Sequence, residues 1–105
     1  MKTYCGTRKS EGCEITVMGD GPKRHLDPRL DLWNHSPEGF EWGYHGSGPA
    51  QASLAILADA LGDPERAVKL HQDFKRRMIS SIVTPMWSMT LDHVMEAVRE
   101  IESRQ

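Results

Sequence analysis

Hydrophobic and polar residues alternate along the first part of the chain. The segment 13–18 has an apolar side chain at every second position, a period of two that predicts a β-strand with one apolar face. A second strand is expected over 2–8, and the polar connection between the two, which ends in Gly12, is typical of a hairpin. We expect a third, edge strand within 23–33, interrupted at Pro28 because proline donates no ladder hydrogen bond.

Three later segments have the spacing of helices. The segment 49–61 is apolar on nearly all sides, which predicts a central, buried helix. The segments 64–80 and 91–103 each have one apolar stripe, and each follows a residue suited to cap a helix, Asp63 and Thr90 respectively. We therefore expect two amphipathic helices packed around the central one.

Strands followed by helices are typical of an α+β fold. We predict a small antiparallel sheet of three to four short strands in the N-terminal part, packed against three C-terminal helices. The 105 residues have the size of one domain, which we assign to 1–105, and 38% hydrophobic with 27% charged residues fits a soluble globular protein. No stretch resembles a signal peptide or a bilayer span, so we expect a cytoplasmic protein with Cys5 and Cys13 as free thiols.

The segment 34–49 differs from the rest because it is rich in glycine and aromatic residues. Phe40, Trp42 and Tyr44 occupy alternate positions, as in a short strand between two loops. Such aromatic side chains could cover part of the core. They could also stack on a base if a phosphate were bound nearby.

A phosphate or carboxylate could bind where Gly46, Ser47 and Gly48 open the first helix, because backbone N–H groups are free there and the helix dipole favours an anion. The glycines could instead only permit a tight turn into a buried helix. The sequence matches neither a Walker motif nor a dinucleotide fingerprint. The candidate ligand-binding residues are His35, Trp42, Tyr44, His45, Gly46, Ser47, Gly48 and Gln51.

The histidines offer a second kind of chemistry. His35 and His45, with Glu38, could form an acid–base or metal site, but their spacing matches no common metal or catalytic motif. We therefore assign no catalytic residue, no metal and no cofactor, and keep a small hydrolase or transferase as an alternative. His71 lies on an apolar helix stripe, where we expect a buried side chain with satisfied hydrogen bonds.

Charge is divided unevenly along the chain, although its formal net value is only -2. The segment 27–65 contains seven acidic residues and one Arg, whereas 66–77 contains five basic residues and one Asp. This basic helix face could bind phosphates or an acidic protein surface, or simply be solvated. The acidic segment beside it argues against direct DNA binding. The face consists of Arg66, Lys69, Lys75, Arg76 and Arg77.

The run at residues 26–51 resembles the core signature of a family of small proteins of unknown function. Its most specific part is Asn-His-Ser-Pro-Glu-Gly-Phe-Glu-Trp-Gly-Tyr-His-Gly-Ser-Gly-Pro-Ala-Gln, at 34–51. Looser similarity extends to Tyr4 and Gly6 and to the segment 73–75. The family occurs in bacteria, phages and plasmids and has no established catalytic residues. The resemblance implies a small accessory protein of mobile elements, of the kind that often antagonises host defence.

Together these observations favour a non-catalytic binding or inhibitor protein of phage or mobile-element type. We expect it to act in counter-defence, for example as an anti-CRISPR protein, by binding a host protein complex in the host cytoplasm. The main alternative is a nucleotide- or phosphate-binding module that sequesters a signal. We expect no membrane partner, and a homodimer through exposed helix surface is plausible for so short a chain.

Overall fold

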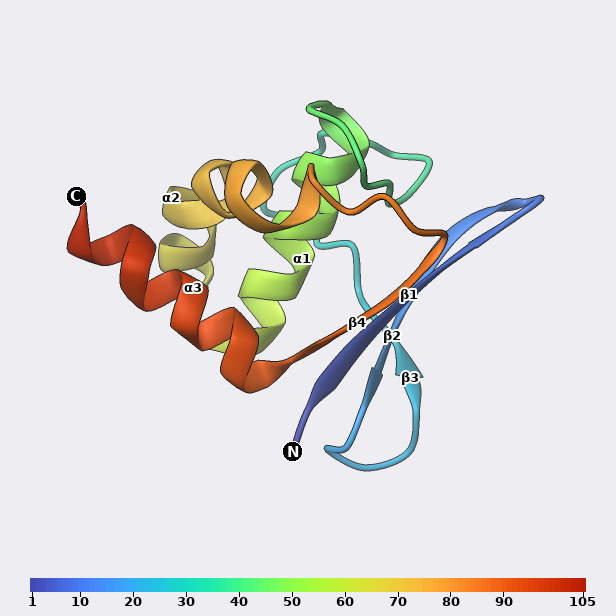
Figure 1. Ribbon diagram of the computed structural model, residues 1–105, viewed down its shortest axis with the longest axis horizontal. Coiled ribbons are helices and arrows are strands. Elements are labelled where there is room, and N and C mark those ends of the chain that lie inside the picture. The colour runs from blue at the N-terminus through green and yellow to red at the C-terminus, as the bar shows by residue number, and fades with distance from the viewer.

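A four-stranded antiparallel sheet and a layer of helices make up the computed structural model, which describes residues 1–105 (Figure 1). The strands are β1 (Thr3–Lys9), β2 (Gly12–Met18), β3 (Arg24–His25) and β4 (Met86–Thr90). They lie in the order β3-β2-β1-β4, so a strand from the C-terminal half pairs with the first strand. The predicted α+β class and antiparallel sheet are confirmed.

The register of the sheet places its apolar residues on one face. Tyr4 lies opposite Val17 on β2 and opposite Met89 on β4, and all three are buried. Gly6, the next residue on this face of β1, lies opposite Ile15 and Trp87. Because side chains alternate across a strand, this face packs on the helices, while the other face carries mostly polar residues together with Met18 and Met86.

One predicted strand is shorter than the sequence indicated, and another does not form. The edge strand expected within 23–33 is limited to Arg24–His25, because the chain leaves the sheet after Leu26, whose N–H donates to the carbonyl of Ile15 at 2.9 Å. The strand expected around Phe40 is wrong: only a single bridge to Cys13 forms there. Its aromatic residues alternate, but positive-φ glycines at 39 and 43 interrupt extended backbone on both sides.

The helices are α1 (Ser47–Leu61), α2 (Pro64–Phe74), the π-helical segment η1 (Lys75–Ile79) and α3 (Leu91–Ser103). All three predicted helices are confirmed, and α2 with η1 together span the second one. Asp63 and Thr90 cap α2 and α3 by accepting hydrogen bonds from backbone N–H groups, as expected. Gly62 ends α1 in the left-handed conformation.

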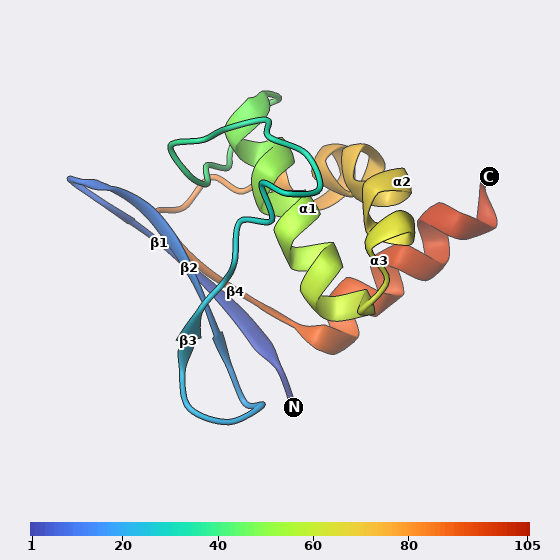
Figure 2. The same ribbon diagram turned by 180° about the vertical axis from the view of Figure 1, so that it is seen from behind.

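The helix α1 lies between the sheet and the pair α2 and α3 (Figures 1 and 2). Every residue from Gly48 to Ala58 is buried, as its all-round apolar sequence predicted. None of the helices combines the length and the apolar character that a bilayer crossing requires.

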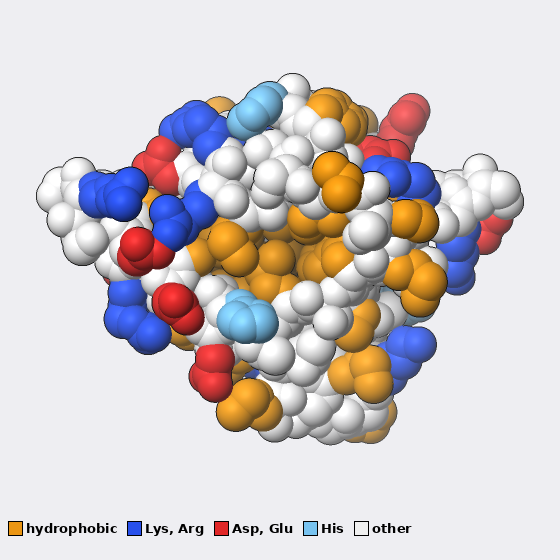
Figure 3. Space-filling view, viewed as in Figure 1, with side chains coloured by type: hydrophobic (Ala, Val, Ile, Leu, Met, Phe, Trp, Pro, Cys, Tyr) orange, Lys and Arg blue, Asp and Glu red, His pale blue; other side chains and the backbone are white.

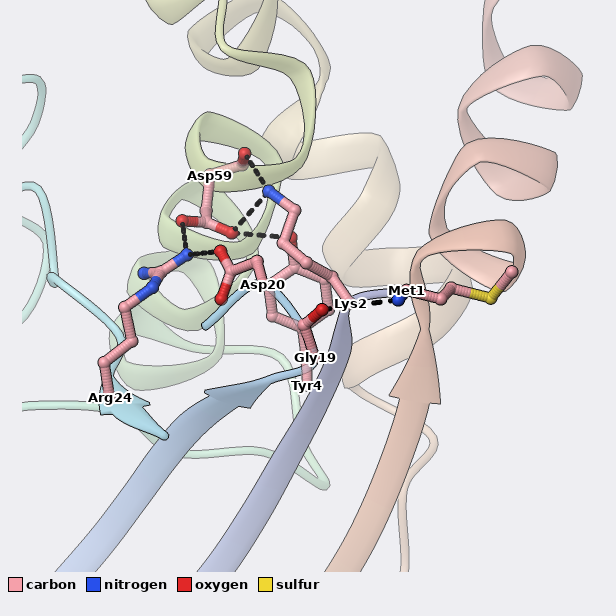
Figure 4. A network of polar contacts seen from close by, with 7 residues as sticks. All are labelled: Met1, Lys2, Tyr4, Gly19, Asp20, Arg24 and Asp59. Carbon is pink, nitrogen blue, oxygen red and sulfur yellow. Dashed lines mark hydrogen bonds and ion pairs between the residues drawn. The ribbon is translucent and has the colours of Figure 1, made fainter. Parts of the chain in front are cut away.

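A carboxylate at the C-terminal end of α1 joins this helix to the sheet. Oδ2 of Asp59 accepts hydrogen bonds from the Tyr4 phenol at 2.7 Å and the Lys2 ammonium at 3.2 Å, while Oδ1 accepts one from Arg24 at 2.9 Å (Figure 4). Burial by itself raises the pKa of Asp59, but these hydrogen bonds outweigh it and hold the pKa below its usual range. Arg24 also pairs with Asp20, so the N-terminal strand, β3 and α1 form one network.

Candidate functional site

Gln51 and His35, two of the predicted ligand-binding residues, hold a loop in place. The buried Gln51 amide accepts hydrogen bonds from the backbone N–H groups of His35 at 2.8 Å and Ser36 at 3.1 Å. Its Nε2 donates to the carbonyl of Pro28 at 2.6 Å. The side chain thus bonds three backbone groups of the 28–36 loop, and this accounts for a polar residue inside the most apolar helix.

His35 lies against His71 rather than against His45. The two Nε2 atoms of His35 and His71 are 2.9 Å apart, and Trp33 stacks on His35 with ring centroids 4.9 Å apart. Nδ1 of His71 is 2.6 Å from the carbonyl of Val68, so Nδ1 carries the proton of this ring. Nε2 of His71 therefore accepts a hydrogen bond from Nε2–H of His35. Burial lowers the pKa of both histidines. The expectation for His71, a buried and satisfied side chain, is confirmed.

The other members of the predicted acid–base site do not join this pair. His45 and Glu38 are exposed and make no polar contact with His35. No group of three or more potential ligand side chains lies close enough together to hold a metal ion. The arrangement brings together two histidines and a tryptophan from the 28–36 loop and α2, whose rings stack or hydrogen-bond with one another.

The start of α1 is tightly packed against the segment before it. A Cβ at Gly48 would lie 2.6 Å from that of Glu41, and a Cβ at Gly46 would overlap the ring of Tyr44. Gly46 is the N-cap residue and Ser47 is exposed, and no side chain caps the helix. Close packing therefore explains the two glycines without a bound anion.

Trp42 and Tyr44 lie in different environments. Trp42 is 1% exposed, donates from Nε1 to the carbonyl of Thr84 at 3.1 Å and meets Trp87 edge to face at 5.4 Å. Tyr44 is 50% exposed. Only Tyr44 therefore offers a ring face to another molecule, and Trp42 serves the core.

Segments far apart in the sequence form a cleft of about 500 Å³ beside these aromatic residues. Its walls come from β1, from the segment 41–44 and from the connection that follows η1. The residues that line it are Arg8, Glu41, Trp42, Gly43, Tyr44, Ile82 and Val83. Of these residues, sequence reasoning identifies only Trp42 and Tyr44 as ligand-binding candidates. A signal that was available for two others is the apolar pair Ile82-Val83 in an otherwise polar connection.

One wall of the cleft carries two opposite charges, Arg8 and Glu41, that form an ion pair. Arg8 donates to Glu41 at 2.9 Å and to the carbonyl of Trp42 at 3.2 Å, and its guanidinium lies 5.1 Å from the centre of the Trp42 ring. Burial raises the pKa of Glu41, but hydrogen bonds, including those from Arg8 and from the backbone N–H of Trp42, outweigh it, so the pKa stays lowered. Burial raises the pKa of the Cys13 thiol, so this neighbour is not an activated nucleophile.

The rim of the cleft is apolar and exposed. Val83 is 91% exposed, and Tyr44, which also lines the cleft, is 50% exposed. Figure 3 shows hydrophobic side chains gathered in and around a hollow in the middle of the face seen in Figure 1, between α3 and β4. Large apolar side chains left in water at neighbouring positions are typical of an interaction surface.

The basic helix face is largely paired within the chain. Arg66 forms a two-pronged ion pair with Glu102 of α3, including a 2.8 Å bond from Nε. Arg77 pairs with Glu100 and Arg76 with Asp73. Lys69 is exposed and Lys75 is half-buried, and neither forms an ion pair. The positive charge on this face is therefore partly neutralised.

A comparison with known families accounts for nearly the whole chain. The sequence model of one family matches residues 4–100. The chain belongs to DUF6166, a family of unknown function. This match confirms one part of the resemblance noted in the sequence, namely that the chain belongs to a family of unknown function. No curated protein and no solved structure matches the chain significantly.

Proposed function

We propose that this protein is a non-catalytic binding protein that docks a segment of a partner protein in the cleft between Tyr44 and Val83. The observation that carries the proposal is the exposure of Tyr44 and Val83 around a formed cleft. Burial of such side chains is the main source of binding free energy at protein interfaces, and tyrosine is common among residues that dominate it.

The polar wall of the cleft suits a peptide chain. Both bonds of Arg8 within the protein come from one terminal nitrogen, so other N–H groups of the guanidinium remain to bond carbonyl groups of a partner. Glu41 lies beside it and disfavours a phosphate through like-charge repulsion. An uncharged, apolar segment with free backbone groups fits this combination best.

The packing of the other candidate residues supports protein docking over nucleotide binding. Trp42 is buried and cannot stack on a base, and Gln51 is already bonded to three backbone groups. The hydrolase alternative needs His35 and His45 together, whereas His35 bonds His71. The basic face of α2 and η1 has fewer free cations than its sequence suggested.

The finer part of the proposal concerns the biological setting. By its resemblance to proteins of phages and plasmids, we propose a counter-defence role in the host cytoplasm, in which the chain occupies a site on a host complex such as a CRISPR effector. A small domain with a cleft of this kind is suited to act by occupancy rather than by turnover. Binding of this kind needs no cofactor.

Site-specific photo-crosslinking in host cells tests the docking surface. A photoreactive phenylalanine replaces Val83 in one version and Met18, exposed on the opposite side of the sheet, in another. We expect a discrete protein adduct from position 83 only, identified by mass spectrometry, which Tyr44→Ala reduces. Equal adducts from both positions, or none from position 83, would overturn the proposal.

The affinity of variants for the identified partner then shows whether the cleft or the basic helix face is the binding surface. Val83→Asp should weaken the affinity at least about tenfold, because it places a charge in the apolar contact. Arg76→Glu with Arg77→Glu should change it much less. The opposite ranking would assign binding to the basic face, and a thermal shift with a nucleotide would favour the alternative function.

A further inference from the structure

The hydrogen bonds that flank β4 show which of its backbone groups face outward. The N–H of Leu91 donates to the carbonyl of Lys2 at 2.9 Å, and the N–H of Arg8 donates to that of Pro85 at 2.8 Å. Bonded pairs alternate along an antiparallel ladder, so the bonded pairs between these two are Tyr4 with Met89 and Gly6 with Trp87. The N–H and C=O groups of Met86, Ser88 and Thr90 therefore point away from β1.

This outer edge is short of partners within the chain. Ser88 is exposed, and neither its N–H nor its C=O has a hydrogen-bond partner on this side. Met86 uses only its carbonyl, which accepts a bond from the Thr84 hydroxyl at 2.8 Å. In Figure 1 β4 lies nearer the viewer than β1, and in Figure 2 it lies behind it, so the free edge belongs to the face in Figure 3.

The edge also lacks the features that usually prevent pairing between chains. The strand Met86–Thr90 contains no lysine, no proline and no charged residue, and its register with β1 has no bulge. Met86 and the apolar hollow beside β4 add exposed hydrophobic surface. A strand laid along this edge would satisfy the backbone groups and cover part of that surface.

We propose that the occupant of this edge is a second copy of the chain, paired antiparallel about a two-fold axis at Ser88. In this register the two Ser88 residues exchange both backbone hydrogen bonds, and Met86 faces the second copy's Thr90. On the helix side Trp87 faces the second copy's Met89, so apolar side chains meet and no like charges oppose each other. The two sheets form one continuous sheet, and the dimer is isologous.

The dimer does not depend on the proposed docking function. Tyr44 and the walls of the cleft lie outside the paired strand, so the dimer would carry two separate clefts. The surface also differs from the exposed helix face on which the sequence suggested a homodimer. It is a strand edge whose pairing is specified by backbone groups, rather than a helix stripe.

Analytical ultracentrifugation of the full chain over a range of concentrations tests the proposal. We expect a concentration-dependent species of twice the 11.9 kDa chain mass. Ser88→Lys places two ammonium groups opposite each other and should raise the dimer dissociation constant at least about tenfold. The matched control Met18→Lys, which adds the same charge to the same sheet face away from the edge, should leave it unchanged.

Charge reversal makes the test specific to the two-fold axis. Ser88→Lys and Ser88→Asp should each be monomeric alone, and an equimolar mixture should restore a dimer, which also shows that both variants are folded. A wild-type chain that stays monomeric at all concentrations overturns the proposal. So does a Ser88→Lys variant that dimerises like the wild type, or a mixture that stays monomeric.

Discussion

The rings of His35 and His71 are joined Nε2 to Nε2 at 2.9 Å, and this contact attaches the loop 28–36 to α2. Because His71 donates from Nδ1 to the carbonyl of Val68, the pair holds one proton between its Nε2 atoms. A further proton on the His71 ring turns its Nε2 from an acceptor into a donor and breaks the bond. Lys75 also disfavours positive charge on both rings, in addition to burial.

The stability of the protein should therefore fall in mild acid. Burial lowers the pKa of both histidines in the folded state, so the unfolded chain binds protons first. The contribution of the two histidines to the unfolding free energy is fully present above the ordinary histidine pKa of about 6.5. It is lost as the pH falls below this value towards the lowered pKa values of the folded state. Urea denaturation at a series of pH values measures this. His71→Gln should flatten the pH dependence, whereas the exposed control His45→Gln should retain it; equal slopes for wild type and His71→Gln would contradict the assignment.

The amide of Gln51 should matter more for stability than its place on an apolar helix suggests. Gln51→Ala leaves two backbone N–H groups and one carbonyl without their partner, and we expect a loss of about 2–4 kcal/mol of unfolding free energy. Gln51→Glu keeps the acceptor for the N–H groups of His35 and Ser36. It also places a carboxylate oxygen against the carbonyl oxygen of Pro28, where two acceptors repel, so it should not restore stability. Urea denaturation and hydrogen exchange at residues 35 and 36 check this. Fast exchange in Gln51→Ala, with the helix amides still protected, is the expected pattern; unchanged exchange there would contradict it.

Most of the fold could be predicted from local patterns in the sequence. The helix 91–103 and the hairpin depend on caps, turns and periodicity, which neighbouring residues determine. The position of β4 could not be predicted, because its pairing with β1 joins residues that are distant in the sequence, as Thr3 and Thr90 are, and five residues carry little periodicity. The aromatic positions 40–44 alternate like a strand, but core packing and positive-φ glycines gave them another conformation.

The candidate site was harder to predict than the fold. A sequence indicates which residues are polar or aromatic but not which of them face one another, and His35 pairs with His71 rather than with its sequence neighbour His45. Gln51 and Trp42 carry functional groups that the interior uses for its own hydrogen bonds. The cleft depends on Arg8 and Val83, which are seventy-five positions apart, so no local motif could reveal it.

Gly6 should tolerate no side chain while Trp87 is present. A Cβ at this position would overlap the Trp87 indole, which lies across the glycine. We expect Gly6→Ala to cost roughly 2–3 kcal/mol through overpacking. In a Trp87→Leu background the same substitution should cost much less, because the indole is gone. Thermal or urea denaturation of the four chains of this double-mutant cycle measures the difference. An equal cost in both backgrounds would show that Gly6 is required for its backbone and not for the space it leaves.

The bond between Tyr4 and Asp59 should be one of the stronger single interactions that hold the sheet to α1. The phenol is buried and donates to a carboxylate at 2.7 Å, and burial together with Asp59 raises the pKa of Tyr4, so it stays protonated. A cycle of Tyr4→Phe and Asp59→Asn should give a coupling energy of about 1–2 kcal/mol by urea denaturation, because hydrogen bonds to charged groups exceed neutral ones. The exposed pair Arg76 and Asp73 is the matched control, and its cycle should give a coupling indistinguishable from zero. Equal coupling in the two cycles would mean that burial of the Asp59 network adds nothing to the strength of the bond between Tyr4 and Asp59.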